Sequence, residues 1–179
     1  QYIYDKGWPS LTHIQNAAIK QVANTDHNLI LSAPTASGKT EAAFIPALNS
    51  VEDWETGLKV LYISPLKALI NDQFHRISEL SEYLDIPITR WHGEVSQAQK
   101  KKVVNQPKGV LLITPESIEG MLVNRPGEAQ HLFKGVEWII IDELHSFLGT
   151  ERGIHLQSLL QRISRFMQAP RFIAMSATL

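Results

Sequence analysis

The sequence contains no cysteine, which excludes several kinds of site within these 179 residues. Without thiols there can be no disulfide bond, no thiolate-ligated zinc site and no iron–sulfur cluster. The absence of cysteine is compatible with an intracellular protein, and we expect the cytoplasm as its compartment. The seven histidines show no spacing typical of a transition-metal site, so a protein-bound transition metal is not expected.

Long apolar runs and an excess of one charge are also missing. Apolar runs are short, as at 138–141, whereas about 20 apolar residues are needed to cross a bilayer. The first residues lack the pattern of a signal peptide, and we expect no membrane association. Seventeen basic residues are balanced by eighteen acidic ones, giving a net charge of −1. Any basic surface for nucleic acid must therefore be local.

What the sequence does contain is a regular alternation of short apolar runs with segments of helical periodicity. The apolar fraction of 44% and the charged fraction of 20% are typical of a folded globular domain. Strands are predicted at 29–33, 59–64, 86–91, 109–114, 138–142 and 171–176, and helices at 11–23, 38–51, 66–84, 95–104, 116–123 and 154–167. Turn residues predict loops at 105–109 and 124–127. This order predicts an α/β fold of three layers, with a mainly parallel central sheet between helices.

A phosphate-binding loop is predicted at 33–40, where Ala-Pro-Thr-Ala-Ser-Gly-Lys-Thr lies between a predicted strand and a predicted helix. The backbone amides of such a loop and the positive end of the following helix bind phosphate oxygens. We expect Lys39 to contact the β- and γ-phosphates and the Thr40 hydroxyl to bind Mg²⁺. The candidate nucleotide-binding residues in this loop are Thr35, Ala36, Ser37, Gly38, Lys39 and Thr40.

Two adjacent carboxylates, Asp142 and Glu143, stand at the end of a predicted apolar strand. Ligands of open α/β sheets bind at the carboxyl ends of the strands. In an enzyme with a phosphate-binding loop, the first acid holds Mg²⁺, and the second orients and deprotonates the attacking water. Asp142 and Glu143 are therefore candidate catalytic residues together with Lys39, and Asp142 is a candidate metal ligand. His145 either contacts the γ-phosphate side or the segment 176–178, or is a packed or solvated histidine.

Together and in order, these segments resemble the motif series of superfamily 2 DExH-box helicases, in particular the first RecA-like domain of the large helicase-related (Lhr-type) proteins. The residues that carry the resemblance are Ser-Pro-Leu-Lys-Ala-Leu at 64–69, Thr-Pro-Glu-Ser at 114–117, Asp-Glu-Leu-His at 142–145 and Gly-Thr-Glu-Arg-Gly-Ile-His-Leu at 149–156. The resemblance covers nearly the whole chain. It implies a RecA-like P-loop NTPase domain that uses ATP and Mg²⁺, in a motor that moves on DNA or RNA, with DNA favoured.

The resemblance also bears on the nucleotide loop and the segment before it. Ala33 replaces the first glycine of the usual pattern, and Ala36 stands where many helicases have another glycine. A Cβ at position 36 restricts the backbone but removes no phosphate-binding amide. Gln15 would bind the edge of the adenine, and an aromatic residue, either Tyr4 or Trp8, would stack on it. Alternatively, Trp8 and Ile14 simply anchor the first helix to the core.

Further residues are implied to hold a nucleic-acid strand or to couple the two ligands. The implied strand contacts lie at strand-to-helix junctions and comprise Pro65, Leu66, Lys67, Gly93, Thr114, Pro115 and Glu116. Each of these, taken alone, also fits ordinary helix capping. The implied coupling residues are His145, Ser176, Ala177 and Thr178.

The chain starts at Gln1 rather than Met and stops after a strand-like segment, so we expect 1–179 to be a fragment of a longer polypeptide. It would lack the second RecA-like domain, whose arginines stabilise the transition state in this superfamily. We therefore expect weak or absent activity from the fragment alone. Two other functions stay open, an ATP-gated nucleic-acid clamp or scaffold and the motor subunit of a restriction or defence complex.

Overall fold

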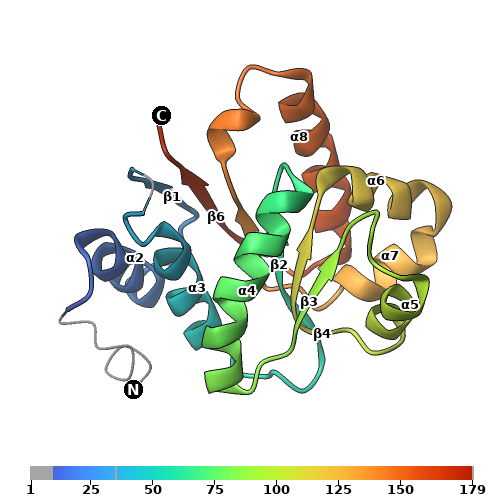
Figure 1. The fold of residues 1–179 in the computed structure, drawn as a ribbon, viewed down its shortest axis with the longest axis horizontal. Helices are drawn as coiled ribbons and strands as arrows, with labels where there is room; N and C mark the ends of the chain where they lie inside the picture. Colours follow the sequence, from blue (N-terminus) through green and yellow to red (C-terminus); the bar gives the residue numbers. More distant parts are fainter. Residues whose placement is uncertain (1–9, 35, 179) are drawn as a thin grey trace.

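A computed structural model describes residues 10–34 and 36–178, and within them a six-stranded sheet lies between two layers of helices (Figure 1). The strands are β1 (Leu29–Ser32), β2 (Gly57–Ile63), β3 (Ile88–Trp91), β4 (Lys108–Ile113), β5 (Trp138–Ile141) and β6 (Arg171–Ser176). Across the sheet they lie in the order β1-β6-β5-β2-β4-β3, and every neighbouring pair is parallel. The predicted three-layer α/β fold is confirmed.

The helices divide between the two faces of the sheet. They are α2 (His13–Asn24), α3 (Lys39–Ser50), α4 (Lys67–Leu84), α5 (Gln97–Asn105), α6 (Pro115–Asn124), α7 (Pro126–Phe133) and α8 (Glu151–Ile163), with the short 3-10 turns η1 (Leu144–Ser146) and η2 (Ser164–Phe166). Helices α2 to α4 pack on one face and α5 to α8 on the other (Figure 1). Among the described residues, no helix is long and apolar enough to cross a bilayer.

Strand β2 shows how the sheet separates the two hydrophobic cores. Successive side chains of a strand point to opposite faces. Val60 and Tyr62 belong to the core under α2 to α4, whereas Leu61 and Ile63 belong to the core under α5 to α8, and all four are fully buried. A parallel strand covered on both faces needs apolar side chains at nearly every position. This explains why β2, β4 and β5 appear in the sequence as nearly continuous apolar runs.

Helix α7 was not predicted, and the loop expected at 124–127 is wrong. Arg125 ends α6, and Pro126 then begins α7. Proline is tolerated in the first turn of a helix because its missing N–H would have no partner there. Tertiary packing stabilises the short helix, since its buried residues join the second core: Ala129, Leu132 and Phe133. The loop expected at 105–109 is also shorter than predicted, because β4 begins at Lys108.

A charged network joins α6 to α8 at the surface of the second core. The Glu119 carboxylate accepts hydrogen bonds from both terminal nitrogens of Arg162, one of them at 3.0 Å, and lies 2.9 Å from His155 Nε2. The Arg162 hydrogen bonds lower the pKa of Glu119 from its ordinary value of 4.5 to about 2, against the opposing effect of burial. Glu119 therefore stays ionised in the folded chain well below the pH at which it is protonated in the unfolded chain.

Glu119→Gln is expected to lower the free energy of unfolding by about 1 kcal/mol near neutral pH, the upper end for a partly exposed ion pair. The folded-state pKa is depressed, so the stabilisation is complete above the unfolded value of 4.5 and is lost as the pH falls towards about 2. Urea unfolding across this range should show the two chains converging. Glu128→Gln, which removes an exposed pair with Arg125, is the control and should change little. A stability difference that is independent of pH would contradict the assignment.

Candidate nucleotide and nucleic-acid site

The phosphate-binding loop lies where β1 ends and α3 begins, at the edge of the sheet where all six described strands have their carboxyl ends (Figure 1). Gly38 precedes α3 with a left-handed φ of 83°, which glycine adopts without strain. A Cβ at this position would also lie 2.5 Å from Gln15 Nε2. The backbone conformation therefore favours glycine here, and a larger residue would also have to displace the Gln15 amide group. Thr35 lies outside the described residues.

Two features of the loop are unfavourable in the chain alone. Ala36 has a left-handed φ of 61°, which costs a residue with a Cβ about 1–2 kcal/mol. The glycine that many helicases have at this position would avoid that strain. The Ser37 hydroxyl is buried without a hydrogen-bond partner among the described atoms. A phosphate oxygen in the loop would supply that partner, so the loop is suited to an anionic ligand.

The Lys39 side chain is held by carbonyl groups of the phosphate-binding loop. Its Nζ donates hydrogen bonds to the carbonyl oxygens of Ala33 and, at 2.8 Å, Pro34. The ammonium group thus adds positive charge near the N-terminus of α3, where the helix dipole is also positive. Thr40 is the next residue and is buried, with 8% of its surface exposed. This combination of charge and backbone donors can bind phosphate groups.

Asp142 follows β5 directly, and its N–H donates to the Ile63 carbonyl at 2.9 Å, extending the pairing with β2. Only 6% of Asp142 is exposed, and its carboxylate accepts hydrogen bonds from the Glu143 N–H, at 2.9 Å, and from the Tyr62 hydroxyl. Burial raises the pKa of Asp142, an effect that the Tyr62 hydrogen bond and the Lys39 charge oppose. Glu143 has a left-handed φ of 48°, so the chain turns sharply between the two acids.

Tyr62 is a residue of this site that was missed in the sequence. Its ring is fully buried, with its centroid 5.5 Å from that of Phe44 on α3. Burial and the adjacent Asp142 carboxylate raise the pKa of Tyr62 well above its ordinary value, so the hydroxyl remains a donor. The available signal was a tyrosine inside a continuous apolar strand, because a buried tyrosine hydroxyl usually has a hydrogen-bond partner.

Tyr62→Phe is expected to lower the free energy of unfolding by about 1.5–3 kcal/mol, because it removes a hydrogen bond to a buried charged group. The ring and its contact with Phe44 are kept, so the loss isolates the hydroxyl. The measurement is chemical denaturation of the 179-residue chain. In a chain that already carries Asp142→Asn, the same change should cost less than about 1 kcal/mol. Equal costs in both backgrounds would show that the hydroxyl does not act through Asp142.

His145 joins the carboxylate pair to the end of β6. Its Nδ1 lies 3.3 Å from Glu143 Oε2 and 3.3 Å from the Ser176 hydroxyl. Ser176 is fully buried and also donates to the carbonyl of Thr178. The structure therefore brings together three of the predicted coupling residues, and Ala177 lies between two of them along the chain. His145 is partly exposed, but its contacts make it more than a solvated histidine.

Gln15 connects the start of α2 to the phosphate loop. It is 2% exposed, and its side chain accepts from the Thr12 N–H at 2.9 Å and donates to the Gly38 carbonyl at 3.4 Å. The residue also borders a groove of about 470 Å³ that is lined by Ser10, Thr12, Gln15, Ala36, Ser37, Gly38, Glu41 and Arg76. Gln15 thus lies beside a space next to the loop. Tyr4 and Trp8, considered for stacking, lie outside the described residues.

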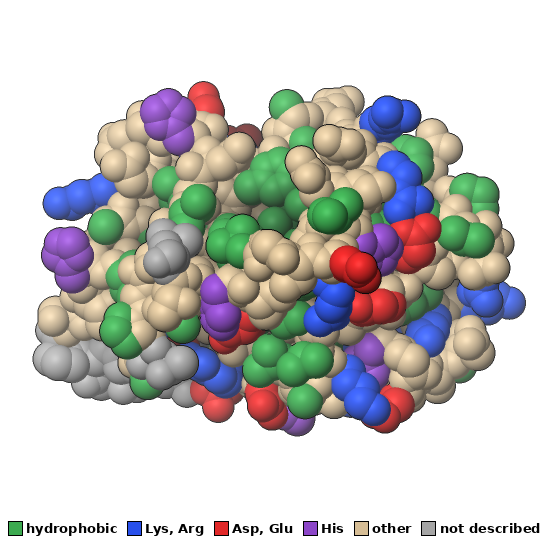
Figure 2. All heavy atoms as spheres, turned by 90° about the horizontal axis from the view of Figure 1, so that it is seen from above, with side chains coloured by type: hydrophobic (Ala, Val, Ile, Leu, Met, Phe, Trp, Pro, Cys, Tyr) green, Lys and Arg blue, Asp and Glu red, His purple; other side chains and the backbone are tan. Residues whose placement is uncertain are grey.

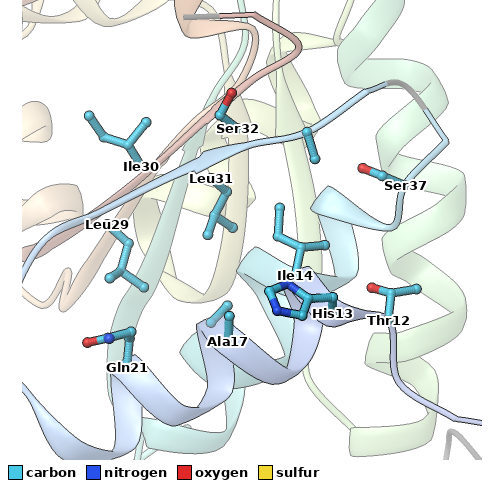
Figure 3. Close-up of a pocket in the computed structure, with 12 residues that line it drawn as sticks. Thr12, His13, Ile14, Ala17, Gln21, Leu29, Ile30, Leu31, Ser32 and Ser37 are labelled. Atoms are coloured by element: carbon cyan, nitrogen blue, oxygen red, sulfur yellow. The ribbon is translucent and has the colours of Figure 1, made fainter.

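A second groove, of about 480 Å³, lies on the β1 side of the loop (Figure 3). Leu29 and Leu31 point from β1 towards α2, whereas Ile30 points away from it, and Thr12 and Ser37 mark the end near the loop (Figure 3). The lining is mostly apolar, and the described residues that form it include no lysine or arginine. This groove is therefore less suited to phosphate than the loop itself.

Most of the predicted nucleic-acid residues meet at the carboxyl ends of β2, β3 and β4. A groove of about 500 Å³ there is lined by Pro65, Leu66, Lys67, His92, Gly93, Thr114, Glu116, Ser117 and Arg152. Pro115 does not line it and is buried in the first turn of α6. Thr114 also caps α6, accepting from the Ser117 N–H at 3.3 Å, so capping and a place in the groove are compatible. On this side of the molecule, basic and acidic side chains lie next to each other (Figure 2).

The fold and the loop define a class. A parallel α/β sheet with a strand–loop–helix carrying Gly-Lys-Thr at 38–40, and a carboxylate pair at the same edge, is a P-loop nucleotide-binding domain. Comparison with known families then gives the particular one. The model of the DEAD/DEAH box helicase family matches residues 12–179, and the chain belongs to this family as its N-terminal RecA-like domain.

Individual relatives agree with this assignment. The chain is 31% identical to the ATP-dependent helicase Lhr-Core of Methanocaldococcus jannaschii over 98% of its own length and 22% of that protein. It is 34% identical to the Lhr helicase/uracil glycosylase of Escherichia coli over 93% of its length and 12% of that protein. The structure of Mycobacterium smegmatis helicase Lhr bound to ssDNA and AMP-PNP is similar, with a TM-score of 0.85 and 30% identity, covering 98% of this chain and 24% of that one. The chain therefore spans less than a quarter of each of these proteins.

Proposed function

We propose that this chain is the ATP-binding domain of a helicase or translocase that couples ATP hydrolysis to movement on nucleic acid, with DNA favoured over RNA. The observation that carries the proposal is the placement of two sites on one edge of the sheet, the phosphate loop with its carboxylate pair and the groove at the ends of β2, β3 and β4. The similarity of the chain to a helicase Lhr that was solved with ssDNA and AMP-PNP supports the choice of ligands.

ATP is bound through residues of the loop and of α2. Lys39 contacts the β- and γ-phosphates, and the backbone amides from Ala36 to Thr40 surround them. The unpartnered Ser37 hydroxyl fits a phosphate oxygen in the same place. Gln15 lies beside the groove next to the loop and reads the edge of the base there. The residues that hold ATP thus come from two elements that already contact each other through Gln15 and Gly38.

Mg²⁺ fits the residues that face the phosphates. Magnesium usually binds one or two carboxylates and completes its shell with phosphate oxygens and water. Asp142 would supply the carboxylate and Thr40 would add its hydroxyl oxygen, and no cluster of three histidine or acidic residues suited to a metal occurs in the described part of the chain. When bound, the ion would neutralise part of the phosphate charge.

Hydrolysis requires a base for the attacking water, and Glu143 is that base. The chain turns sharply at Glu143, and its carboxylate lies next to His145. The two acids therefore have different surroundings and serve different roles. Asp142 holds its orientation through Tyr62 and the Glu143 N–H, while Glu143 takes the proton of the water. Through its contact with His145 and hence Ser176, Glu143 is linked to the segment 176–178, which couples the nucleotide to the nucleic-acid groove.

A bound strand would lie along the groove at the carboxyl ends of β2, β3 and β4. The residues that line this groove and are expected to contact the strand are Pro65, Leu66, Lys67, Gly93, Thr114 and Glu116, whereas Pro115 is buried in α6 and does not line it. Helix N-termini in this region offer backbone amides to phosphates without reading the bases.

Movement can be separated from static binding by streptavidin displacement from biotinylated single-stranded DNA, using the complete polypeptide. A motor displaces streptavidin with ATP and not with a non-hydrolysable analogue. A strand that is bound but never cleared of streptavidin indicates an ATP-gated clamp instead.

The complete polypeptide, which we place in the cytoplasm, is expected to contain a second RecA-like domain. The support is the small share of each relative that this chain spans, 22% and 12% of the two helicases compared above. In this superfamily arginines of the second domain stabilise the transition state.

The isolated 179-residue chain is therefore expected to hydrolyse ATP about 10³–10⁵-fold more slowly than the complete polypeptide, and to unwind no duplex, because arginine fingers supply rate factors of that size. Phosphate release from both proteins, at equal concentration and with single-stranded DNA present, gives the ratio. Unwinding by the isolated chain at the rate of the complete protein would show that its own residues suffice.

A further inference from the structure

Arg152, in the first turn of α8, lines the groove at the carboxyl ends of β2, β3 and β4, and both of its hydrogen-bond partners are distant in sequence. It lies 36 residues after Glu116 and 87 residues after Pro65. Its side chain is 42% exposed, so part of the guanidinium group is open to solvent. None of the roles proposed above uses this residue.

Three contacts fix the guanidinium group in the groove. Arg152 Nη2 donates to the carbonyl oxygen of Pro65 at 2.8 Å and to Glu116 Oε1 at 2.7 Å. The group also lies over the ring of Phe147, 5.5 Å from its centroid, and Phe147 is 1% exposed. Arg152 thereby connects α8 to the β2–α4 junction and to α6. A cation anchored in this way loses less conformational entropy on binding a ligand than a free surface arginine does.

The backbone before α8 is built to deliver Arg152 to this place. Thr150 caps the helix, its hydroxyl accepting from the Gly153 N–H at 3.2 Å and donating to the Phe147 carbonyl at 2.9 Å. A Cβ on Gly153 would lie 2.0 Å from that carbonyl oxygen, so the close turn requires glycine. The turn is continuous with the carboxylate pair through η1, where the Ser146 N–H donates to the Glu143 carbonyl at 2.8 Å.

The groove has two ion pairs, each of one basic and one acidic side chain. Lys67 pairs with Glu94, and Arg152 pairs with Glu116. Burial would raise the pKa of Glu116, but its backbone hydrogen bond and the Arg152 hydrogen bond outweigh burial and leave the pKa below its ordinary value. Glu116 is therefore ionised, and its carboxylate repels a phosphate. Of this pair, only Arg152 can attract one.

We propose that Arg152 binds a backbone phosphate of the nucleic-acid strand, held in position by Pro65 and Glu116. The inference rests on the function proposed above. A guanidinium group offers several N–H donors in a planar arrangement that matches phosphate oxygens, and Nη2 alone forms the hydrogen bonds to Pro65 and Glu116. Because a partly exposed ion pair contributes only about 0–1 kcal/mol, a phosphate can share Arg152 with Glu116 at little cost.

The test is the affinity of the complete polypeptide for a fluorescein-labelled oligothymidylate, measured by anisotropy over a series of salt concentrations. Arg152→Gln is expected to weaken binding roughly tenfold and to lower the slope of log affinity against log salt by about 0.7, the value of one phosphate contact on a single strand. Arg152→Lys keeps the charge and should keep the slope while binding more weakly. Arg125→Gln is the matched control, because Arg125 is exposed, pairs with Glu128 and does not line the groove.

Affinity for a fluorescent ATP analogue, measured for each variant, confirms that the variants are folded. Arg152→Gln binding the oligonucleotide with the original affinity and slope overturns the inference while leaving the proposed function intact. Weaker binding with an unchanged slope also overturns it, since that result assigns Arg152 a purely structural role. If the unchanged polypeptide itself fails to bind the oligonucleotide, the proposed function fails, and the inference fails with it.

Discussion

Glu143→Gln is expected to slow ATP hydrolysis by about 10²–10⁴-fold, the usual contribution of a general base, while ATP affinity stays within about twofold. The amide has nearly the shape of the carboxylate but cannot accept the proton of the attacking water. Binding should be kept because the residues assigned to the phosphates and to Mg²⁺ are Lys39, Thr40 and Asp142. The left-handed turn at Glu143 is a backbone feature that glutamine can also adopt at similar cost.

Steady-state phosphate release and equilibrium binding of an ATP analogue, both on the complete polypeptide, separate the two effects. Glu137→Gln is a matched control, because Glu137 precedes the buried strand β5 whereas Glu143 follows it. Lys59, the partner of Glu137, lies near the start of β2, so both residues lie at the end of the sheet opposite the phosphate loop. This control should hydrolyse ATP at the original rate. If Glu143→Gln were to hydrolyse ATP normally, the base would have to be another residue.

Lys39→Ala is expected to weaken ATP binding by about 100-fold or more and to leave the fold unchanged. Charge-assisted hydrogen bonds contribute about 1.5–3 kcal/mol each, and Lys39 is assigned two phosphates. Among the described residues, its ammonium group bonds only to the carbonyl oxygens of Ala33 and Pro34, which lie in a loop open to solvent, so its loss should cost little stability.

Calorimetric titration with ATP and Mg²⁺ measures this loss, and a thermal melt of the same sample checks the fold. Lys134→Ala, at the exposed end of α7, removes the same charge far from the loop in sequence and should bind ATP normally. An unchanged ATP affinity for Lys39→Ala would remove the assignment of 33–40 as the phosphate-binding loop.

The fold could be predicted because its signals are local. Strands covered on both faces must be apolar at nearly every position, so β2, β4 and β5 stand out in the sequence. The loop at 33–40 and the pair Asp142 and Glu143 follow strands, and the parallel topology places strand ends at one edge. Helix α7 was missed because its stability comes from burying Leu132 and Phe133 rather than from its own sequence, which begins with a proline and a glycine.

The contacts within the site could not be predicted in the same way, because they join residues that are distant in sequence. Tyr62 and Asp142 are 80 residues apart, and Arg152 and Pro65 are 87 apart. Only the register of β2 with β5 and the angle of α8 bring these pairs together. Gln15 was identified from its motif, but its hydrogen bond to Gly38 and its part in capping α2 became visible only in the structure. The assigned roles of the site residues remain predictions.

The measurement that tests the central claim most directly is ATP turnover by the complete polypeptide as single-stranded DNA is added. Coupling between the phosphate loop and the groove, through His145 and Ser176, predicts that turnover rises with DNA concentration and saturates. The rise should be absent in Glu143→Gln. Turnover that is the same with and without nucleic acid would contradict the account.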